Sequence, residues 1–282
     1  MNEHFDVIVV GGGHAGCEAA LASSRMGAKT ALITFSRDSI ARMSCNPSIG
    51  GIAKSHLVFE IDALGGEMAK NTDYTGIQFK TLNTRKGPAV QANRVQSDKQ
   101  LYAGRMQAVI IATNNLTVLE DKVIGLSVVN DQIEGLITAR KGRIAGKAVV
   151  LTPGTFLKGL IHIGKQAKPG GRLDEDSADE LGQTLLDLGF RMGRLKTGTP
   201  ARLDKNSLDY QEMTIQPGEY PPAFFSWQAS RDNHLFHVEQ SDPANKSMFH
   251  VEQYGSSLMP WQPGSDQLPC YLTHTPRQRT RS

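Results

Sequence analysis

The chain begins with a short apolar run, a glycine-rich turn and a helical pattern of small residues. Residues 5–10 (Phe-Asp-Val-Ile-Val-Val) are mostly apolar and β-branched, which is typical of a buried parallel strand. A helix is predicted from His14 to about Met26, because its alanines suit close packing on a sheet and Gly27 stands where a glycine commonly ends a helix. Residues 29–33 predict a second strand.

The turn between the first strand and the helix fits the pattern G-x-G-x-x-G. In that pattern the glycines permit a tight turn, a close approach of the backbone to a diphosphate, and contact between helix and strand. Phosphate oxygens then meet the N–H groups at the start of the helix. We therefore predict that a dinucleotide binds at Gly11, Gly12, Gly13, His14, Ala15 and Gly16.

The end of the second strand departs from the usual fingerprint. An acidic residue commonly stands there and holds the ribose hydroxyls, whereas this chain has Thr34. The fingerprint alone therefore leaves open which dinucleotide binds.

Cys45 lies in the segment Ser44–Gly51, just before a helix predicted at about residues 52–64. A helix N-terminus favours a reactive thiolate, but most cysteines are small buried hydrophobes, and position alone does not choose between these roles. Cys17 lies among alanines in the first predicted helix and is interpreted as structural.

Later patterns predict a hairpin around Asn130-Asp131, a buried strand at 148–151 and an amphipathic helix at about 178–188. Prolines multiply after residue 197, which indicates a domain boundary. The predicted domains are residues 1–196 and residues 197–275.

The polar stretch 228–266 contains the string Phe-His-Val-Glu-Gln twice, at 236–240 and 249–253. We interpret this stretch as an expanded surface loop. The spacing of its histidines and glutamates matches no known zinc or iron pattern, so no metal site is predicted.

Composition narrows the class of protein. No apolar run in the 282 residues approaches the roughly 18–20 that a membrane-spanning helix needs, and the N-terminus lacks the features of a signal peptide. Three scattered cysteines predict a reducing, cytoplasmic location without a disulfide framework. A net charge of +3 is too small to argue for nucleic acid by itself.

Seven segments together resemble one family, the MnmG/GidA family, which is the FAD-dependent subunit of the enzyme that modifies the tRNA wobble uridine. Each segment contains a residue string that matches this family, and such strings have no general structural reason to occur together in one chain. The segments lie at residues 11–16, 44–51, 61–66, 76–79, 86–90, 194–200 and 267–275. The resemblance ends at about Thr275, and a basic tail follows at 276–282.

The resemblance implies an α/β fold. Its main part would be a Rossmann-like FAD-binding domain of the two-dinucleotide-binding flavoprotein type, incomplete in this chain, with a smaller inserted α/β or β-rich domain. It implies FAD at the glycine turn, where this family lacks the acidic residue that Thr34 replaces, and flavin contacts at Val123 and Ser177. It also implies catalytic roles for Cys45 and Cys270.

The implied activity is the addition of a carboxymethylaminomethyl group to C5 of the wobble uridine, with NADH as reductant and methylenetetrahydrofolate as one-carbon donor. The implied partners are tRNA, a second copy of the chain and an MnmE-type GTPase in a heterotetramer. Candidate contacts to tRNA phosphates or the flavin are Lys86, Arg94, Lys196 and Arg202, although a single surface cation is usually only solvated.

Two other functions are weighed against this one. A flavin disulfide reductase needs two cysteines a few residues apart, and Cys17, Cys45 and Cys270 are far apart in the sequence. A non-catalytic remnant would keep an FAD-binding half-domain or a partner-binding role. A bound flavin chromophore and modification of the wobble uridine distinguish an enzyme from such a remnant.

Overall fold

The computed structural model describes residues 4–173, 175–228 and 267–273. The chain forms two compact units that alternate along the sequence. The first unit comprises Met1–Ser44, Gly65–Glu67 and Tyr102–Thr197, and the second comprises Cys45–Leu64, Met68–Leu101 and Gly198–Ser282. The domain bounds that the sequence suggests, 1–196 and 197–275, stay a prediction.

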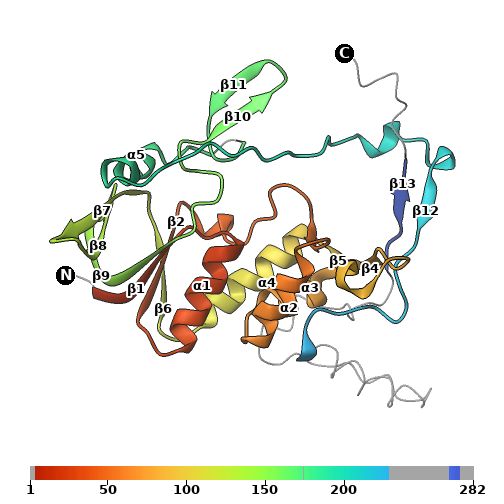
Figure 1. Cartoon of the computed structure of the whole chain (residues 1–282), viewed down its shortest axis with the longest axis horizontal. Coiled ribbons are helices and arrows are strands. Elements are labelled where there is room, and N and C mark those ends of the chain that lie inside the picture. Colours follow the sequence, from red (N-terminus) through yellow and green to blue (C-terminus); the bar gives the residue numbers. More distant parts are fainter. Residues whose placement is uncertain (1–3, 174, 229–266, 274–282) are drawn as a thin grey trace. The chain divides into compact units, whose positions relative to one another are not determined.

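The first unit contains a mixed six-stranded sheet (Figure 1). Its strands lie in the order β6 (Leu116–Glu120), β2 (Thr30–Thr34), β1 (His4–Val10), β9 (Gly142–Leu151), β8 (Gln132–Thr138) and β7 (Val123–Val129). The first four are parallel to one another, and β8 and β7 continue the sheet as antiparallel strands. This arrangement confirms the predicted α/β fold.

Burial explains why β1 stands at the centre of the sheet. Alternate residues of a strand face opposite sides, and Ile8 and Val9 are both fully buried, so both faces of β1 are covered. Ile8 belongs to a core cluster that includes Ile33 of β2 and Leu181 of α5 (Asp179–Asp187). The helix α1 (His14–Arg25) packs against β1, β2 and β6.

Several predicted elements are confirmed at close to their predicted bounds. The predicted hairpin turn lies between β7 and β8, where Asn130 and Asp131 both have positive φ, as a two-residue type I′ turn requires. The remaining elements of this unit are a second hairpin, β10 (Leu160–Ile163) and β11 (Gln166–Pro169), a 3₁₀ turn at Arg37–Ser39, and most of α4 (Lys99–Ala112).

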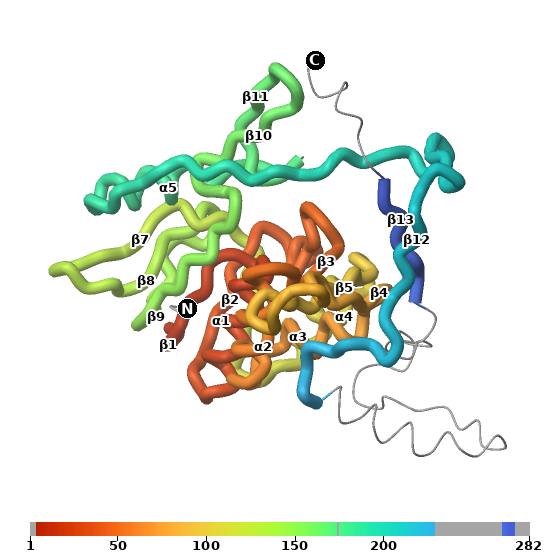
Figure 2. Tube along the Cα trace, turned by 45° about the vertical axis from the view of Figure 1, so that its right-hand side comes forward, coloured from red at the N-terminus to blue at the C-terminus, as the bar shows by residue number. Residues whose placement is uncertain are grey.

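The second unit is built around a small antiparallel sheet (Figure 2). Its strands lie in the order β3 (Ser48–Gly50), β5 (Ala92–Ser97) and β4 (Gly76–Leu82), next to the helices α2 (Ser55–Ala63) and α3 (Met68–Thr75). A two-stranded sheet pairs β12 (Thr214–Gln216) with β13 (Cys270–Leu272). Three 3₁₀ turns lie at Pro88–Val90, Lys205–Ser207 and Tyr210–Glu212.

Side chains tie together segments of the second unit that are distant in sequence. The carboxylate of Asp73, on α3, accepts hydrogen bonds from the backbone N–H groups of Phe225 (3.0 Å) and Ser226 (2.7 Å). The Gln267 amide accepts from the N–H of Phe79 (2.8 Å) and donates to the carbonyl of Glu219 (2.7 Å). Residues 219–228 and 267–273 are thereby fixed to α3 and β4.

The repeated Phe-His-Val-Glu-Gln strings and the basic tail lie outside the described residues. Within residues 4–173, 175–228 and 267–273, no helix has the length and apolar character that crossing a membrane requires.

The buried carboxyl of Asp73 predicts a pH-dependent stability. Burial raises the pKa of Asp73 to about 8, and the N–H groups of Phe225 and Ser226 lower this pKa only in part. Because the folded-state pKa exceeds the ordinary value of 3.8, the contribution of Asp73 is fully present below that value and is lost as the pH rises through about 8. We expect the free energy of unfolding to fall over this range by up to about 1.4 kcal/mol per pH unit.

Urea unfolding of the wild type and of Asp73→Asn at several pH values tests this expectation. Asparagine has nearly the same shape as aspartate and does not titrate, so the pH-dependent fall should be smaller in this variant. Asp131→Asn, at the exposed β7–β8 turn, is the control and should keep the wild-type dependence. Equal pH dependence in Asp73→Asn and the wild type would contradict the assignment.

Candidate functional site

The β1–α1 turn accepts only glycine at two of its positions. Gly11 follows β1 with φ +105°, and a Cβ there would lie 2.4 Å from the carbonyl oxygen of Thr152. A Cβ on Gly16 would lie 1.8 Å from the carbonyl oxygen of Gly11. Both distances are far below van der Waals contact, so the turn and the first turn of α1 pack backbone against backbone.

The second glycine of the pattern, Gly13, faces open space. It precedes α1 with an extended backbone and no side-chain cap, and a Cβ built on it meets no atom within 4 Å. The first N–H groups of a helix have no intrahelical partners, and the first turn of α1 carries no acidic residue. The site therefore fits a diphosphate, whose oxygens these N–H groups and the helix dipole attract.

Thr34 ends β2, as the sequence predicts. Its hydroxyl lies 3.0 Å from the Ser39 hydroxyl and donates to the carbonyl of Ser36 at 3.3 Å. Its register partner on β6, Glu120, forms an ion pair with Arg37 at 3.3 Å. A hydroxyl thus stands where other dinucleotide sites have a carboxylate.

His14 is the first residue of α1 and is half-buried. Burial lowers the pKa of its imidazole, and the positive charge of Arg172 lowers it further, so His14 is uncharged at neutral pH. The ring packs edge-on against Tyr102 at 5.5 Å between centroids, and its Nδ1 is buried without a hydrogen-bond partner. The imidazole therefore adds no positive charge of its own beside the first N–H groups of α1.

The two other predicted flavin contacts also belong to the first unit. Val123 begins β7 and is buried in the core cluster, whereas the Ser177 hydroxyl is buried and hydrogen-bonded to the Asp179 carboxylate at 2.7 Å. Their contact with a flavin stays a prediction.

Cys45 is half-buried in the second unit and lies against the Thr-Gly-Thr-Pro segment. Its Sγ is 3.5 Å from the carbonyl oxygen of Gly198, and Arg202 donates to the Cys45 carbonyl at 3.0 Å. The helix predicted at about residues 52–64 is confirmed as α2, which begins at Ser55. Between Cys45 and that helix, residues 48–50 pair with β5 and form the short strand β3, which the sequence did not predict.

Cys270, on β13, is half-buried and lies beside a buried amide that the sequence analysis missed. Its thiol donates to the Oε1 of Gln78 at 2.8 Å, and the Nε2 of Gln78 donates to the Gln216 carbonyl at 2.9 Å. Gln78 is 1% exposed although it is polar, and the only signal in the sequence is a glutamine inside an otherwise apolar run.

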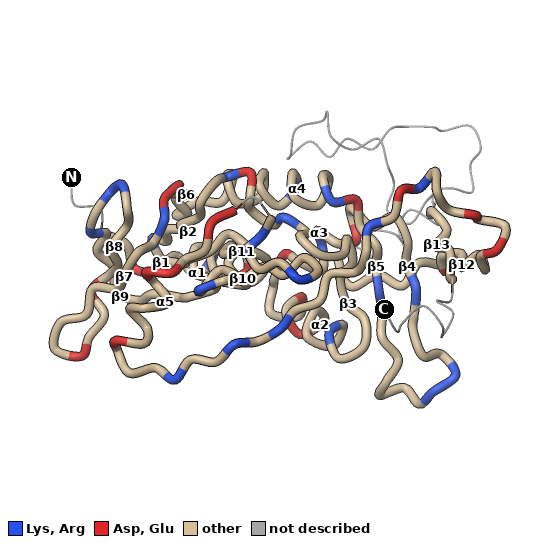
Figure 3. Tube along the Cα trace, turned by 90° about the horizontal axis from the view of Figure 1, so that it is seen from above, with Lys and Arg blue, Asp and Glu red and all other residues tan. Residues whose placement is uncertain are grey.

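The four candidate cations are divided between the units. Lys196, in the first unit, is exposed, as are Lys86 and Arg202 in the second. Arg94 lies on β5 and donates to the Gln216 side chain at 3.3 Å, while its Nε is buried without a partner. Figure 3 shows several Lys and Arg residues spaced along the segment that follows α5.

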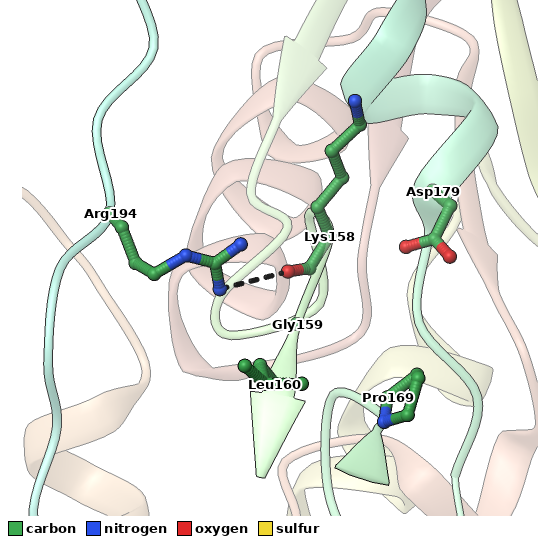
Figure 4. Close-up of a pocket in the computed structure, with 6 residues that line it drawn as sticks. All are labelled: Lys158, Gly159, Leu160, Pro169, Asp179 and Arg194. Atoms are coloured by element: carbon green, nitrogen blue, oxygen red, sulfur yellow. Dashed lines mark hydrogen bonds between the residues drawn. The ribbon is translucent and has the colours of Figure 1, made fainter. Parts of the chain in front are cut away.

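An open pocket of about 290 Å³ lies at the base of the β10–β11 hairpin. Arg194 lines it and donates to the Lys158 carbonyl at 3.3 Å (Figure 4). None of the predicted site residues lines this pocket. Within the part of the chain that the structure describes, no cluster of three or more His, Cys, Asp or Glu side chains is arranged to hold a metal ion.

A family model described as "Glucose inhibited division protein A" matches residues 6–253 of the chain, which is most of its length. The chain belongs to this family. The GidA resemblance drawn from the seven sequence segments is thereby confirmed.

Relatives of this GidA-family chain carry the name tRNA uridine 5-carboxymethylaminomethyl modification enzyme MnmG. The protein from Geobacter sulfurreducens is 55% identical over 229 residues, which are 81% of this chain and 36% of that protein. The protein from a Sulfurihydrogenibium species is 48% identical over 273 residues, which are 96% of this chain and 40% of that protein.

A solved structure of Aquifex aeolicus GidA is 52% identical, with a TM-score of 0.77, over 80% of this chain and 37% of that chain. The GidA-family chain therefore spans well under half the length of these relatives.

The three cysteines should differ in reactivity. Cys17 is fully buried, and burial raises the pKa of its thiol to about 12, so it should resist alkylation. Cys45 and Cys270 are partly exposed and should react. We expect iodoacetamide to label both in the native protein and to spare Cys17, as measured by mass spectrometry of peptides.

The same reaction in urea is the control and should label all three cysteines. Modification of Cys17 in the folded protein at the rate seen in urea would contradict the structure.

Proposed function

We propose that this chain binds FAD at the β1–α1 turn and acts in the modification of the tRNA wobble uridine at C5 with a carboxymethylaminomethyl group. The observation that carries the proposal is the open backbone cradle at Gly13, between two glycines that admit no side chain. It occurs in a chain about half identical to proteins named for that modification.

In this proposal the residues of the first unit hold the cofactor. The N–H groups at the start of α1 bind its diphosphate, and the neutral His14 adds no charge beside them. When bound, the flavin would supply the redox chemistry. Val123 and Ser177 are proposed to lie near it.

The second unit is proposed to supply the reactive side chains. Cys45 and Cys270 act as nucleophile or acid/base; Gly198 faces the first thiol and Gln78 accepts from the second. The exposed cations Lys86, Lys196 and Arg202, with the half-buried Arg94, are proposed to contact tRNA phosphates.

The remaining parts of the proposal rest on the family resemblance. NADH serves as reductant and methylenetetrahydrofolate as one-carbon donor. The chain works in the cytoplasm as a homodimer, together with a GTPase of the MnmE type.

Gly13→Ala tests the cofactor site without disturbing the fold. Gly13 has φ −72°, which alanine adopts without strain, and its Cβ would meet no protein atom. The methyl group would instead occupy the space next to the diphosphate. We expect Gly13→Ala to melt like the wild type without flavin but to bind FAD at least about tenfold more weakly, as measured by flavin fluorescence.

Gly104→Ala is the matched control, because Gly104 on α4 also has no neighbour around its Cβ position. It should bind FAD as the wild type does. If Gly13→Ala binds FAD with wild-type affinity, the proposed FAD site is refuted. If the wild-type chain does not bind FAD, the proposed function is refuted.

Wobble-uridine modification in a strain lacking its own enzyme tests the activity. We expect the full chain to restore the modified nucleoside, Cys45→Ser and Cys270→Ser to abolish it while still binding FAD, and Cys17→Ser to keep it. Mass spectrometry of tRNA nucleosides is the measurement. A chain that binds FAD but restores no modification would instead be the non-catalytic FAD-binding protein.

A further inference from the structure

A chain of contacts joins the phosphate-binding turn to a partly buried arginine of the same unit. The N–H of Ala41 donates to the carbonyl of Gly12 at 2.8 Å. The next residue, Arg42, donates to the Oε1 of Glu175 at 3.0 Å, and the same oxygen lies 3.6 Å from the Nη1 of Arg172. Arg172 is thus linked to the turn through one carboxylate.

A second set of contacts reaches Arg172 from the other side of the turn. The hydroxyl of Thr152 donates to the carbonyl of Gly11 at 3.1 Å. Phe156 follows shortly after Thr152, and the Arg172 guanidinium lies over its ring at 5.3 Å from the centroid. The arginine is therefore held between a carboxylate and an aromatic ring. The carboxylate pairs with Arg42, whose neighbour Ala41 is bonded to the turn, and the ring belongs to the segment that Thr152 joins to the turn.

The charges around Arg172 do not balance. One carboxylate, Glu175, serves two guanidiniums, and the side chain of Arg172 is only 18% exposed whereas that of Arg42 is 60% exposed. The Nη1 of Arg172 is shielded from water, and its only contact with Glu175 that the structure gives is the 3.6 Å ion pair, longer than a hydrogen bond. The Oε2 of Glu175 is also buried without a hydrogen-bond partner. A buried guanidinium stays charged and is costly without hydrogen-bonding acceptors, so this position favours an additional anion.

The charge of Arg172 also acts at the start of α1. It contributes to the lowered pKa of His14, the first residue of that helix. Its field therefore covers the place where the N–H groups of α1 are proposed to bind phosphate.

We infer that Arg172, held by Glu175 and Phe156, is the side chain that binds the diphosphate of the dinucleotide together with the N–H groups of α1. The inference rests on the proposed FAD site and adds a cationic side chain to the backbone cradle. Charge-assisted hydrogen bonds of guanidinium to phosphate are stronger than neutral ones, so Arg172 should supply much of the affinity for the diphosphate.

Titration of the full chain, purified without flavin, with FAD, ADP and riboflavin tests this role. ADP carries the diphosphate without the flavin, and riboflavin carries the flavin without phosphate. We expect Arg172→Gln to weaken FAD and ADP alike, by about tenfold, and to leave riboflavin unchanged. Arg172→Lys, which keeps the charge but loses the planar fork, should recover part of the affinity.

Arg143→Gln is the matched control, because Arg143 is an exposed arginine of the same unit whose partner is Glu134 on the neighbouring strand. It should bind all three ligands as the wild type does. Thermal unfolding without ligand identifies any misfolded variant. If Arg172→Gln is misfolded, Arg172→Lys tests the role of Arg172 instead, because lysine keeps a cationic side chain over the Phe156 ring.

Three results would overturn the inference. They are wild-type ADP affinity in a folded Arg172→Gln, an equal loss of riboflavin affinity, or no recovery in Arg172→Lys. If the wild type binds FAD while one of these holds, only the role of Arg172 fails. If the wild type binds neither FAD nor ADP, the proposed function itself fails, and the inference with it.

Discussion

The close approach of backbone to backbone at the β1–α1 turn is the constraint on which the first unit depends. Gly11 lies against the carbonyl of Thr152 and Gly16 lies against the carbonyl of Gly11, with room for no side chain at either contact. These contacts set the start of α1 at the carboxyl end of β1. They also leave Gly13 as the one glycine of residues 11–16 with open space at its Cβ position, which is why the geometry suits a ligand.

The parallel pairing of β1 with β2 and β9 brings the rest of the site to the same edge of the sheet. Parallel strands place their carboxyl ends together, so Thr34 and Thr152 come to the turn from segments far apart in sequence. Backbone hydrogen bonds from these segments, together with the Thr152 hydroxyl, shape the cradle. A preformed backbone site of this kind loses little conformational freedom on binding.

The second unit relies on a different device. Its strands are short, and buried polar side chains join its distant segments by accepting backbone N–H groups that would otherwise be unpaired. Asp73 holds residues 225–226, and Gln267 holds the strand β4. These hydrogen bonds between distant segments help to place the Cys270 thiol beside the buried amide of Gln78. Cys270 and the amide beside it therefore come from parts of the chain that are far apart in sequence.

Local patterns were sufficient to predict β1, α1, β2, the β7–β8 hairpin and α5, because each rests on residues close together in sequence: an apolar run, a glycine at a turn, or an apolar stripe. The glycine cradle followed for the same reason, whereas the GidA family came from the resemblance of seven separate segments. The sequence did not reveal α4, whose buried residues are diluted by polar ones, or β3, which exists only because β5 pairs with it. The tertiary structure alone placed Gln78 beside Cys270, Gly198 beside Cys45 and Arg42 beside Glu175, because long-range packing brings these residues together and no local spacing records it.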